Sequence, residues 1–235
     1  MKNKSIRFYI SLGLELSVVV FAILGIILSM LAPKNEFMGG VTNLLYFTTQ
    51  SNIWIAIVLG TIFTFKILEI INKKAYLKNW MYVVKLIFTV AITLTGIVYC
   101  FLLAPVLPEE FDTWSLHSIF EHALVPLFAV ADMFIDEYKI EFKKKHVGMV
   151  IFPPLYYLIF SIIGYVCKIE YSTGENYPYF FLNFGSPAGI FGFSKEEPYI
   201  GSFYWILMML VIVLVFGFIY RLLFNKLNYK KIEEK

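Results

Sequence analysis

Five polar residues in a row interrupt an apolar stretch in the first quarter of the chain. They are Thr48, Thr49, Gln50, Ser51 and Asn52, within residues 44–71. Polar side chains in hydrocarbon are costly unless they have partners, so such a cluster is a candidate functional site. A threonine hydroxyl becomes an effective nucleophile when a base takes its proton, and histidine is the usual base. His122, in a separate apolar segment, is the natural partner.

Helical spacing distinguishes these five residues from one another. Thr48, Ser51 and Asn52 share one helix face by their i, i+3 and i+4 spacing, whereas Gln50 points away from it. At about 1.5 Å of rise per residue, Thr48 lies about 6 Å into its segment and His122 about 10 Å into its own. If both segments enter the membrane from the same side, the hydroxyl and the imidazole are expected at one depth.

The composition defines the class of protein that must position these groups. Hydrophobic residues make up 59% of the 235 residues and charged residues only 16%, more apolar than a soluble domain of this length. The pattern predicts a single all-α, polytopic membrane domain over residues 1–235, because no strand alternation is visible. Six apolar segments reach the length of about 20 residues that a spanning helix needs. They lie near residues 7–32, 44–71, 80–104, 115–135, 148–167 and 201–225.

Basic residues predict the orientation of the six helices. Lysine and arginine concentrate within residues 2–7, 73–78, 139–145 and 221–235, all on one side of the predicted bundle. The opposite connections carry only Lys34, Lys168 and Lys195. The positive-inside rule therefore predicts both termini in the cytoplasm, in a multi-pass cell membrane protein, most simply a bacterial plasma membrane protein. The basic loops should contact anionic lipid headgroups, and no motif indicates nucleic-acid binding.

A proline and a long connection add to the candidate site. Pro126 has no backbone N–H and so cannot bond the carbonyl of His122, which predicts a kink or a widened turn there. Residues 168–200 form a connection well beyond the usual ~12 to 15 residues, and they are rich in aromatic residues. This segment is expected either to cover an acyl-chain tunnel as a hydrophobic lid or to rest on the lipid surface as an amphipathic cap.

Other intramembrane chemistries find little support. Neither the His-Glu-x-x-His pattern of zinc proteases nor the Gly-x-Ser-x-Gly elbow of serine hydrolases occurs. His117 and Glu121 lie one turn apart, but His122 points roughly 140° away from His117, so three converging ligands are not expected. The sequence therefore predicts neither a metal nor a cofactor.

Three charged residues lie inside the predicted spans. Glu15 is the one that suggests a proton or cation pathway. Lys85 is expected to snorkel to the membrane surface and Asp132 to be interfacial, because both lie near the inner ends of their helices.

Three short motifs carry a resemblance to a known family. They are Tyr46-Phe47-Thr48-Thr49-Gln50-Ser51-Asn52, then His122-Ala-Leu-Val-Pro126 followed by Asp132, and Tyr177-Pro178-Tyr179-Phe180-Phe181-Leu182. Together with the six-helix pattern, which covers nearly the whole chain, they resemble the androgen-induced, FAR-type family of membrane proteins and its bacterial relatives. After Phe-Leu that family often has an acidic residue, where this chain has Asn183.

The resemblance implies an intramembrane hydrolase of fatty acid esters, including esters of hydroxy fatty acids. It implies Thr48 as the nucleophile and His122 as the base; Thr49 is the neighbouring alternative. The other candidates for oxyanion or substrate binding are Asn52, Gln50, Ser51, Asn183 and Tyr177.

A second hypothesis needs no catalysis. In it, Thr48, Asn52, His122 and Glu15 together coordinate a solute or lipid in a small transporter or binding protein. The absence of an obvious internal repeat or of paired broken helices counts against a transporter.

Overall fold

The fold was analysed in a computed structural model of the chain, which describes residues 4–32, 40–107, 112–137, 140–172 and 174–233. Lys34 and parts of three of the four basic groups used above, 2–7, 139–145 and 221–235, lie outside these residues, as do the side chains of residues 228–233. The structure is 75% helical, and none of the described residues forms a β-strand. The fold is therefore all-α, as predicted.

Six helices are long and apolar enough to cross a membrane, which confirms the number and the approximate positions predicted from the sequence. The spans are Ile6–Leu31, Phe47–Asn72, Asn79–Val106, Leu116–Ile135, Lys144–Val166 and Ser202–Leu227. Their α-helical parts are α1 (Ile6–Leu31), α2 (Phe47–Asn72), α3 (Asn79–Val98), α4 (Leu116–Ile119), α5 (Val125–Ile135), α6 (Lys144–Gly148), α7 (Phe152–Val166) and α8 (Ser202–Glu233). Short 3-10 turns lie at Val41–Leu45, Ala104–Val106, Met149–Ile151 and Phe180–Leu182.

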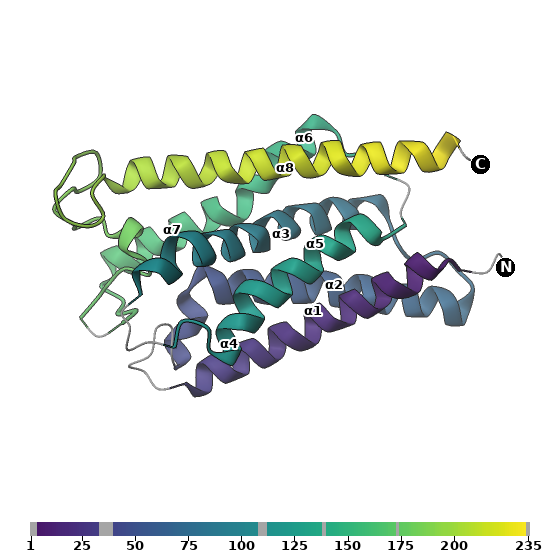
Figure 1. The fold of residues 1–235 in the computed structure, drawn as a ribbon, viewed down its shortest axis with the longest axis horizontal. Helices are drawn as coiled ribbons and strands as arrows, with labels where there is room; N and C mark the ends of the chain where they lie inside the picture. Colours follow the sequence, from purple (N-terminus) through teal and green to yellow (C-terminus); the bar gives the residue numbers. More distant parts are fainter. Residues whose placement is uncertain (1–3, 33–39, 108–111, 138–139, 173, 234–235) are drawn as a thin grey trace.

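Helix α3 is the centre of the bundle. Of its most apolar stretch 67% is buried, against 22–44% for the other five spans. It packs against α2, α5, α7 and α8, whereas α1 packs mainly against α2 and α5 (Figure 1). Large hydrophobic side chains remain exposed along α1, α7 and α8. A helix bundle with an apolar exterior is what a lipid environment requires.

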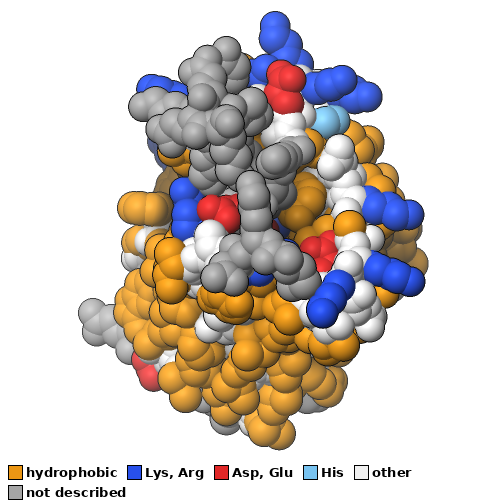
Figure 2. Space-filling model, turned by 90° about the vertical axis from the view of Figure 1, so that its right-hand side faces the viewer, with side chains coloured by type: hydrophobic (Ala, Val, Ile, Leu, Met, Phe, Trp, Pro, Cys, Tyr) orange, Lys and Arg blue, Asp and Glu red, His pale blue; other side chains and the backbone are white. Residues whose placement is uncertain are grey.

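Both chain ends lie at the same end of the bundle, where α1 begins and α8 ends (Figure 1). Figure 2 looks at that end and shows Lys and Arg side chains around the upper and right parts of the face, above a hydrophobic region. The long connection before α8 lies at the opposite end of the bundle (Figure 1).

Two π-helical turns widen neighbouring spans. One, Tyr99–Leu103, continues α3, and the other, Phe120–Leu124, joins α4 to α5 just before Pro126. The second confirms the widened turn predicted from that proline. Extra residues in a helical turn alter its hydrogen bonds and often occur at functional sites.

Gly96 lets α3 approach this widened turn closely. A Cβ at Gly96 would lie 2.9 Å from the carbonyl oxygen of His122 and 3.2 Å from the Pro126 ring. We expect Gly96→Ala to lower the free energy of unfolding by about 1 to 3 kcal/mol, because backbone atoms must move apart. Thermal unfolding in detergent micelles measures this. Gly13→Ala on α1 is the matched control, because a Cβ there meets nothing within 4 Å. Equal midpoints for the two variants would contradict the close approach.

Candidate functional site

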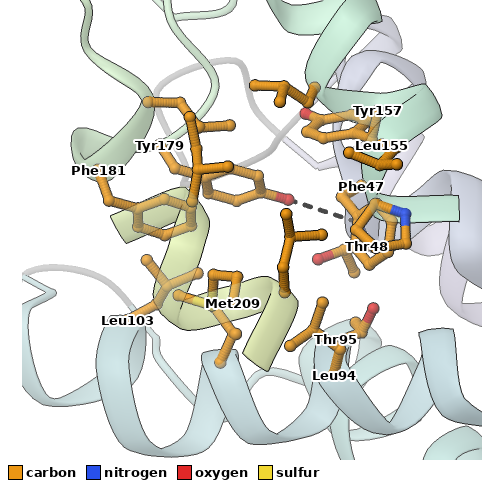
Figure 3. Close-up of a pocket in the computed structure, with 16 residues that line it drawn as sticks. Phe47, Thr48, Leu94, Thr95, Leu103, Leu155, Tyr157, Tyr179, Phe181 and Met209 are labelled. Carbon is orange, nitrogen blue, oxygen red and sulfur yellow. Dashed lines mark hydrogen bonds between the residues drawn. The ribbon is translucent and has the colours of Figure 1, made fainter. Parts of the chain in front are cut away.

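Thr48 lies in the first turn of α2 and faces an apolar cavity (Figure 3). Its side chain is almost fully buried. Its backbone N–H donates to the hydroxyl of Tyr179 over 3.4 Å, the dashed line in Figure 3. The Thr48 side chain and the Tyr179 hydroxyl line the same cavity. The predicted nucleophile is therefore next to a phenol and an open space.

The cavity holds about 680 Å³ of empty space, counted together with its mouth. It lies between α2, α3, α7, α8 and the long connection, and almost all of its wall is apolar. The lining residues are Phe47, Thr48, Leu94, Thr95, Val98, Leu103, Pro154, Leu155, Tyr157, Leu158, Tyr179, Phe181, Leu182, Ile206, Met209 and Leu210. Concave, mostly apolar sites with few polar groups are typical of ligand sites. The lining of this cavity is compatible with an apolar ligand.

Tyr179 is a site residue that the sequence reasoning missed. It lies in the long connection, outside the spans, and its ring stacks on Phe181. Burial raises the pKa of Tyr179 to about 12, so the phenol keeps its proton at neutral pH. The candidate from the same motif, Tyr177, instead donates to Glu175 and does not line the cavity. The Tyr-Pro-Tyr motif was the available signal, but it could not show which ring turns inward.

His122 lies in the π-helical turn Phe120–Leu124 and is almost fully buried. Its ring stacks on Tyr99, with 3.5 Å between centroids and 13° between planes. Its Nδ1 is 3.0 Å from the carbonyl oxygen of Ser118. A carbonyl can only accept, so Nδ1 carries the proton and Nε2 has the free lone pair. Nε2 is buried and has no hydrogen-bond partner, which is the state that a general base requires.

Thr48 and His122 belong to adjoining parts of the bundle but do not touch as a catalytic pair. Among the hydrogen bonds of the described residues, none joins the two side chains, and His122 does not line the cavity. Asn52 links their surroundings, because its Nδ2 donates to the carbonyl of Thr48 (2.9 Å) and to that of Glu121 (3.2 Å).

These two bonds correct the role predicted for Asn52. Both of its acceptors are carbonyls, so both amide protons are already donated and neither remains for an oxyanion. Asn52 instead ties α2 to the turn that carries His122. Ser51 is likewise structural, since its hydroxyl contacts the Thr48 carbonyl and the Thr95 hydroxyl.

The remaining predicted candidates point elsewhere. Gln50 donates to the carbonyl of Leu44, and neither Gln50 nor Asn183 lines the cavity. The side chain of Asn183 accepts the N–H of Gly185 within the long connection. Gln50 belongs to α2 and Asn183 to the long connection, and their binding of substrate or of an oxyanion stays a prediction.

Thr49 belongs to a different buried network. Its hydroxyl donates to the side-chain oxygen of Asn43, whose Nδ2 donates to the hydroxyl of Ser29. The Ser29 hydroxyl in turn lies 3.5 Å from a carboxyl oxygen of Glu121. Of the two neighbouring threonines, Thr48 is therefore the one that lines the cavity.

Five charged side chains form a second buried group, which we call the ion-pair cluster. Its members are Glu15 on α1, Lys66 on α2, Lys85 on α3, and Asp132 and Asp136 at the end of α5. The predictions for Lys85 and Asp132 were wrong: both are fully buried and paired with each other, 2.6 Å apart. Lys66 was missed, although a lysine inside an apolar span was a visible signal.

The ion-pair cluster is separate from the cavity. Lys66 follows Thr48 by 18 residues on α2, or about 27 Å along the helix axis. The structure therefore does not bring Glu15 together with Thr48, Asn52 and His122, as a single solute site would require.

The fold and the cavity define a polytopic helical membrane protein with an apolar binding space. Compared with known proteins, the chain matches no family model, no curated protein and no solved structure.

Proposed function

We propose that the protein is an intramembrane hydrolase of fatty acid esters, with Thr48 as the nucleophile and His122 as the general base. One observation carries the proposal: Thr48 lies at the wall of an apolar cavity, beside the Tyr179 phenol. The family resemblance of the Thr48 and His122 motifs supports the same chemistry.

The reaction would proceed in two halves. The Thr48 hydroxyl attacks the ester carbonyl, and Nε2 of His122 accepts its proton. The tetrahedral intermediate collapses, the alcohol leaves with that proton, and the acyl group remains on the Thr48 oxygen. A water molecule, deprotonated by the same nitrogen, then attacks the acyl-threonine ester and releases the fatty acid.

Tyr179 is the best placed donor for the oxyanion. Its phenol is protonated at neutral pH and sits at the Thr48 side chain, whereas the Asn52 amide is occupied. A donor aimed at the developing charge is usually a large contribution to catalysis. None of the described residues that line the cavity is acidic, so none of them would repel the oxyanion.

Proton transfer needs a closer approach than the resting geometry has. A base must come within about 3 Å of the proton it takes, directly or through one water. The proposal therefore requires that substrate binding or a bound water connects the Thr48 hydroxyl to the free lone pair of His122. Catalytic hydrogen bonds often tighten only when substrate is bound.

The proposal includes an orientation of the helix bundle in the membrane. The basic ends of the helices lie with both termini, so we infer that this end is cytoplasmic, that it contacts anionic lipid headgroups and that the membrane is a plasma membrane. The cavity and Tyr179 then belong to the outer half of the bundle, and the substrate is a membrane lipid or another fatty acyl ester that partitions into lipid.

The proposal is tested with His122. Purified protein in micelles should hydrolyse the p-nitrophenyl ester of a long-chain fatty acid, and His122→Phe should reduce kcat/KM by about 100-fold or more, the usual contribution of a general base. A phenylalanine keeps a ring against Tyr99 but removes the base. His146→Ala, at the opposite end of the bundle, is the control. A folded His122→Phe protein with unchanged hydrolysis, or wild-type protein without any, would overturn the proposal.

A further inference from the structure

We propose that the ion-pair cluster is a proton-binding site that holds one proton on Glu15. The site is independent of ester hydrolysis: it lies in the half of the bundle near the chain ends, away from the cavity, and it joins four helices. Its occupant follows from charge, burial and the contacts of each carboxylate.

All five members of the cluster are buried, with at most 2% of any side chain exposed. Three carboxylates face two ammonium groups, so the fully ionised cluster has one negative charge in excess. An uncompensated charge in a low-dielectric interior costs several kcal/mol, and protonation of one carboxylate removes it. A single bound proton is the smallest change that makes the cluster neutral.

Two of the carboxylates are well compensated. Asp136 lies 2.8 Å from each of the two ammonium groups, those of Lys66 and Lys85, and also accepts the backbone N–H of Glu137. Asp132 lies 2.6 Å from the Lys85 ammonium and accepts the hydroxyl of Ser11. Both have a cation and a neutral donor, so both are best kept ionised.

Glu15 is the least compensated carboxyl of the three. Its Oε1 lies 2.7 Å from the Lys66 ammonium but 3.7 Å from that of Lys85, which is shared with both aspartates. Its Oε2 is buried and has no hydrogen-bond partner; Asp132 Oδ2 has none either, but that oxygen lies 2.6 Å from the Lys85 ammonium. The Tyr82 phenol on α3 is a further titratable group near the cluster, and Glu69 on α2 is another that interacts with Tyr82. The proton is therefore assigned to Glu15.

A metal ion fits the cluster less well than a proton. Oxygen atoms of Glu15, Asp132 and Asp136 lie within 4.8 Å of one another, close enough to ligate a cation. The two ammonium groups, however, already contact all three carboxylates, so an added ion would meet two positive charges at short range. A proton adds its charge without needing that space.

Infrared spectroscopy of the full-length protein in nanodiscs tests the proposal, because protonated and ionised carboxyl groups absorb at different frequencies. All measurements use Glu121→Gln as the parent protein. The Glu121 carboxyl is also buried and its partner, the Ser29 hydroxyl, is neutral, so a proton on Glu121 would add a second band to the spectrum. At neutral pH we expect one protonated carboxyl per parent molecule, calibrated against a carboxylic acid standard. Exchange into deuterated buffer should shift its band.

Charge-changing variants make the test specific. Glu15→Gln, which has nearly the same shape as the protonated side chain, should abolish the band. Asp132→Asn should abolish it as well, because two carboxylates then balance two ammonium groups. Lys66→Met should raise the signal to two protonated carboxyls per molecule.

Two results would overturn the proposal. A parent protein without the band would mean that a cation or no ligand balances the cluster. A band that survives both Glu15→Gln and Asp132→Asn would arise from another group. Thermal unfolding of each variant shows that the comparison is made on folded protein. Retained ester hydrolysis in Glu15→Gln would show that loss of the proton-binding site does not remove the hydrolytic activity.

Discussion

Thr48→Ala is expected to lower kcat/KM for fatty acid ester hydrolysis by about a thousandfold or more, because loss of a nucleophile removes the covalent route altogether. The alanine keeps the backbone N–H that bonds Tyr179, so the wall of the cavity should change little. Release of p-nitrophenol from a long-chain ester by purified protein measures the loss. The residual rate reports what the cavity and Tyr179 achieve without the hydroxyl.

Two variants separate catalysis from packing in this experiment. Thr49→Ala removes a neighbouring hydroxyl that is bonded to Asn43, so it should reduce stability but leave kcat nearly unchanged. Thr48→Ser keeps a hydroxyl on the same carbon and should retain much of the activity. If instead Thr49→Ala is inactive and Thr48→Ala is not, the nucleophile has been assigned to the wrong threonine.

The membrane fold could be predicted from the sequence because each helix must satisfy its own backbone in lipid. Length and hydropathy were therefore enough to locate six spans to within a few residues. The widened turn before Pro126 was predictable for the same local reason, since a missing N–H changes the hydrogen bonds of its own helix. Features within one helix can be predicted from one segment.

The candidate site was predictable only in part, because its contacts join segments far apart in the chain. Spacing placed Thr48, Ser51 and Asn52 on one face, and they do face the interior of the bundle. It could not show that the Asn52 amide is used by the carbonyls of Thr48 and Glu121, or that Tyr179 reaches Thr48 from the long connection. Such contacts depend on how helices are arranged, which hydropathy does not specify.

The charged residues show the same limit more strongly. A lysine near the end of a span is expected to reach water, as predicted for Lys85. In the structure α3 is the central helix, and Lys85 lies on a fully buried part of it, where it pairs with Asp132 instead. Whether a lysine reaches the surface depends on the position of its helix in the bundle.

Lys85→Met is expected to lower the free energy of unfolding by about 3 to 5 kcal/mol, the usual cost of leaving a buried charge without its partner. The ammonium contacts Asp132 at 2.6 Å and Asp136 at 2.8 Å, and methionine fills a similar volume without compensating either carboxylate. The bundle should unfold at a lower temperature or a lower fraction of denaturing detergent, measured by circular dichroism in micelles.

The double variant Lys85→Met/Asp132→Asn tests the electrostatic origin of that loss. It removes one cation and one carboxylate together, so the cluster again has one more carboxyl group than ammonium groups, as in the wild type. It should therefore regain a substantial part of the lost stability, because the remaining pair of Lys66 and Asp136 is intact. Lys226→Met, on the exposed part of α8, should leave the unfolding free energy nearly unchanged. If the double variant is less stable than Lys85→Met alone, packing rather than charge governs the cluster.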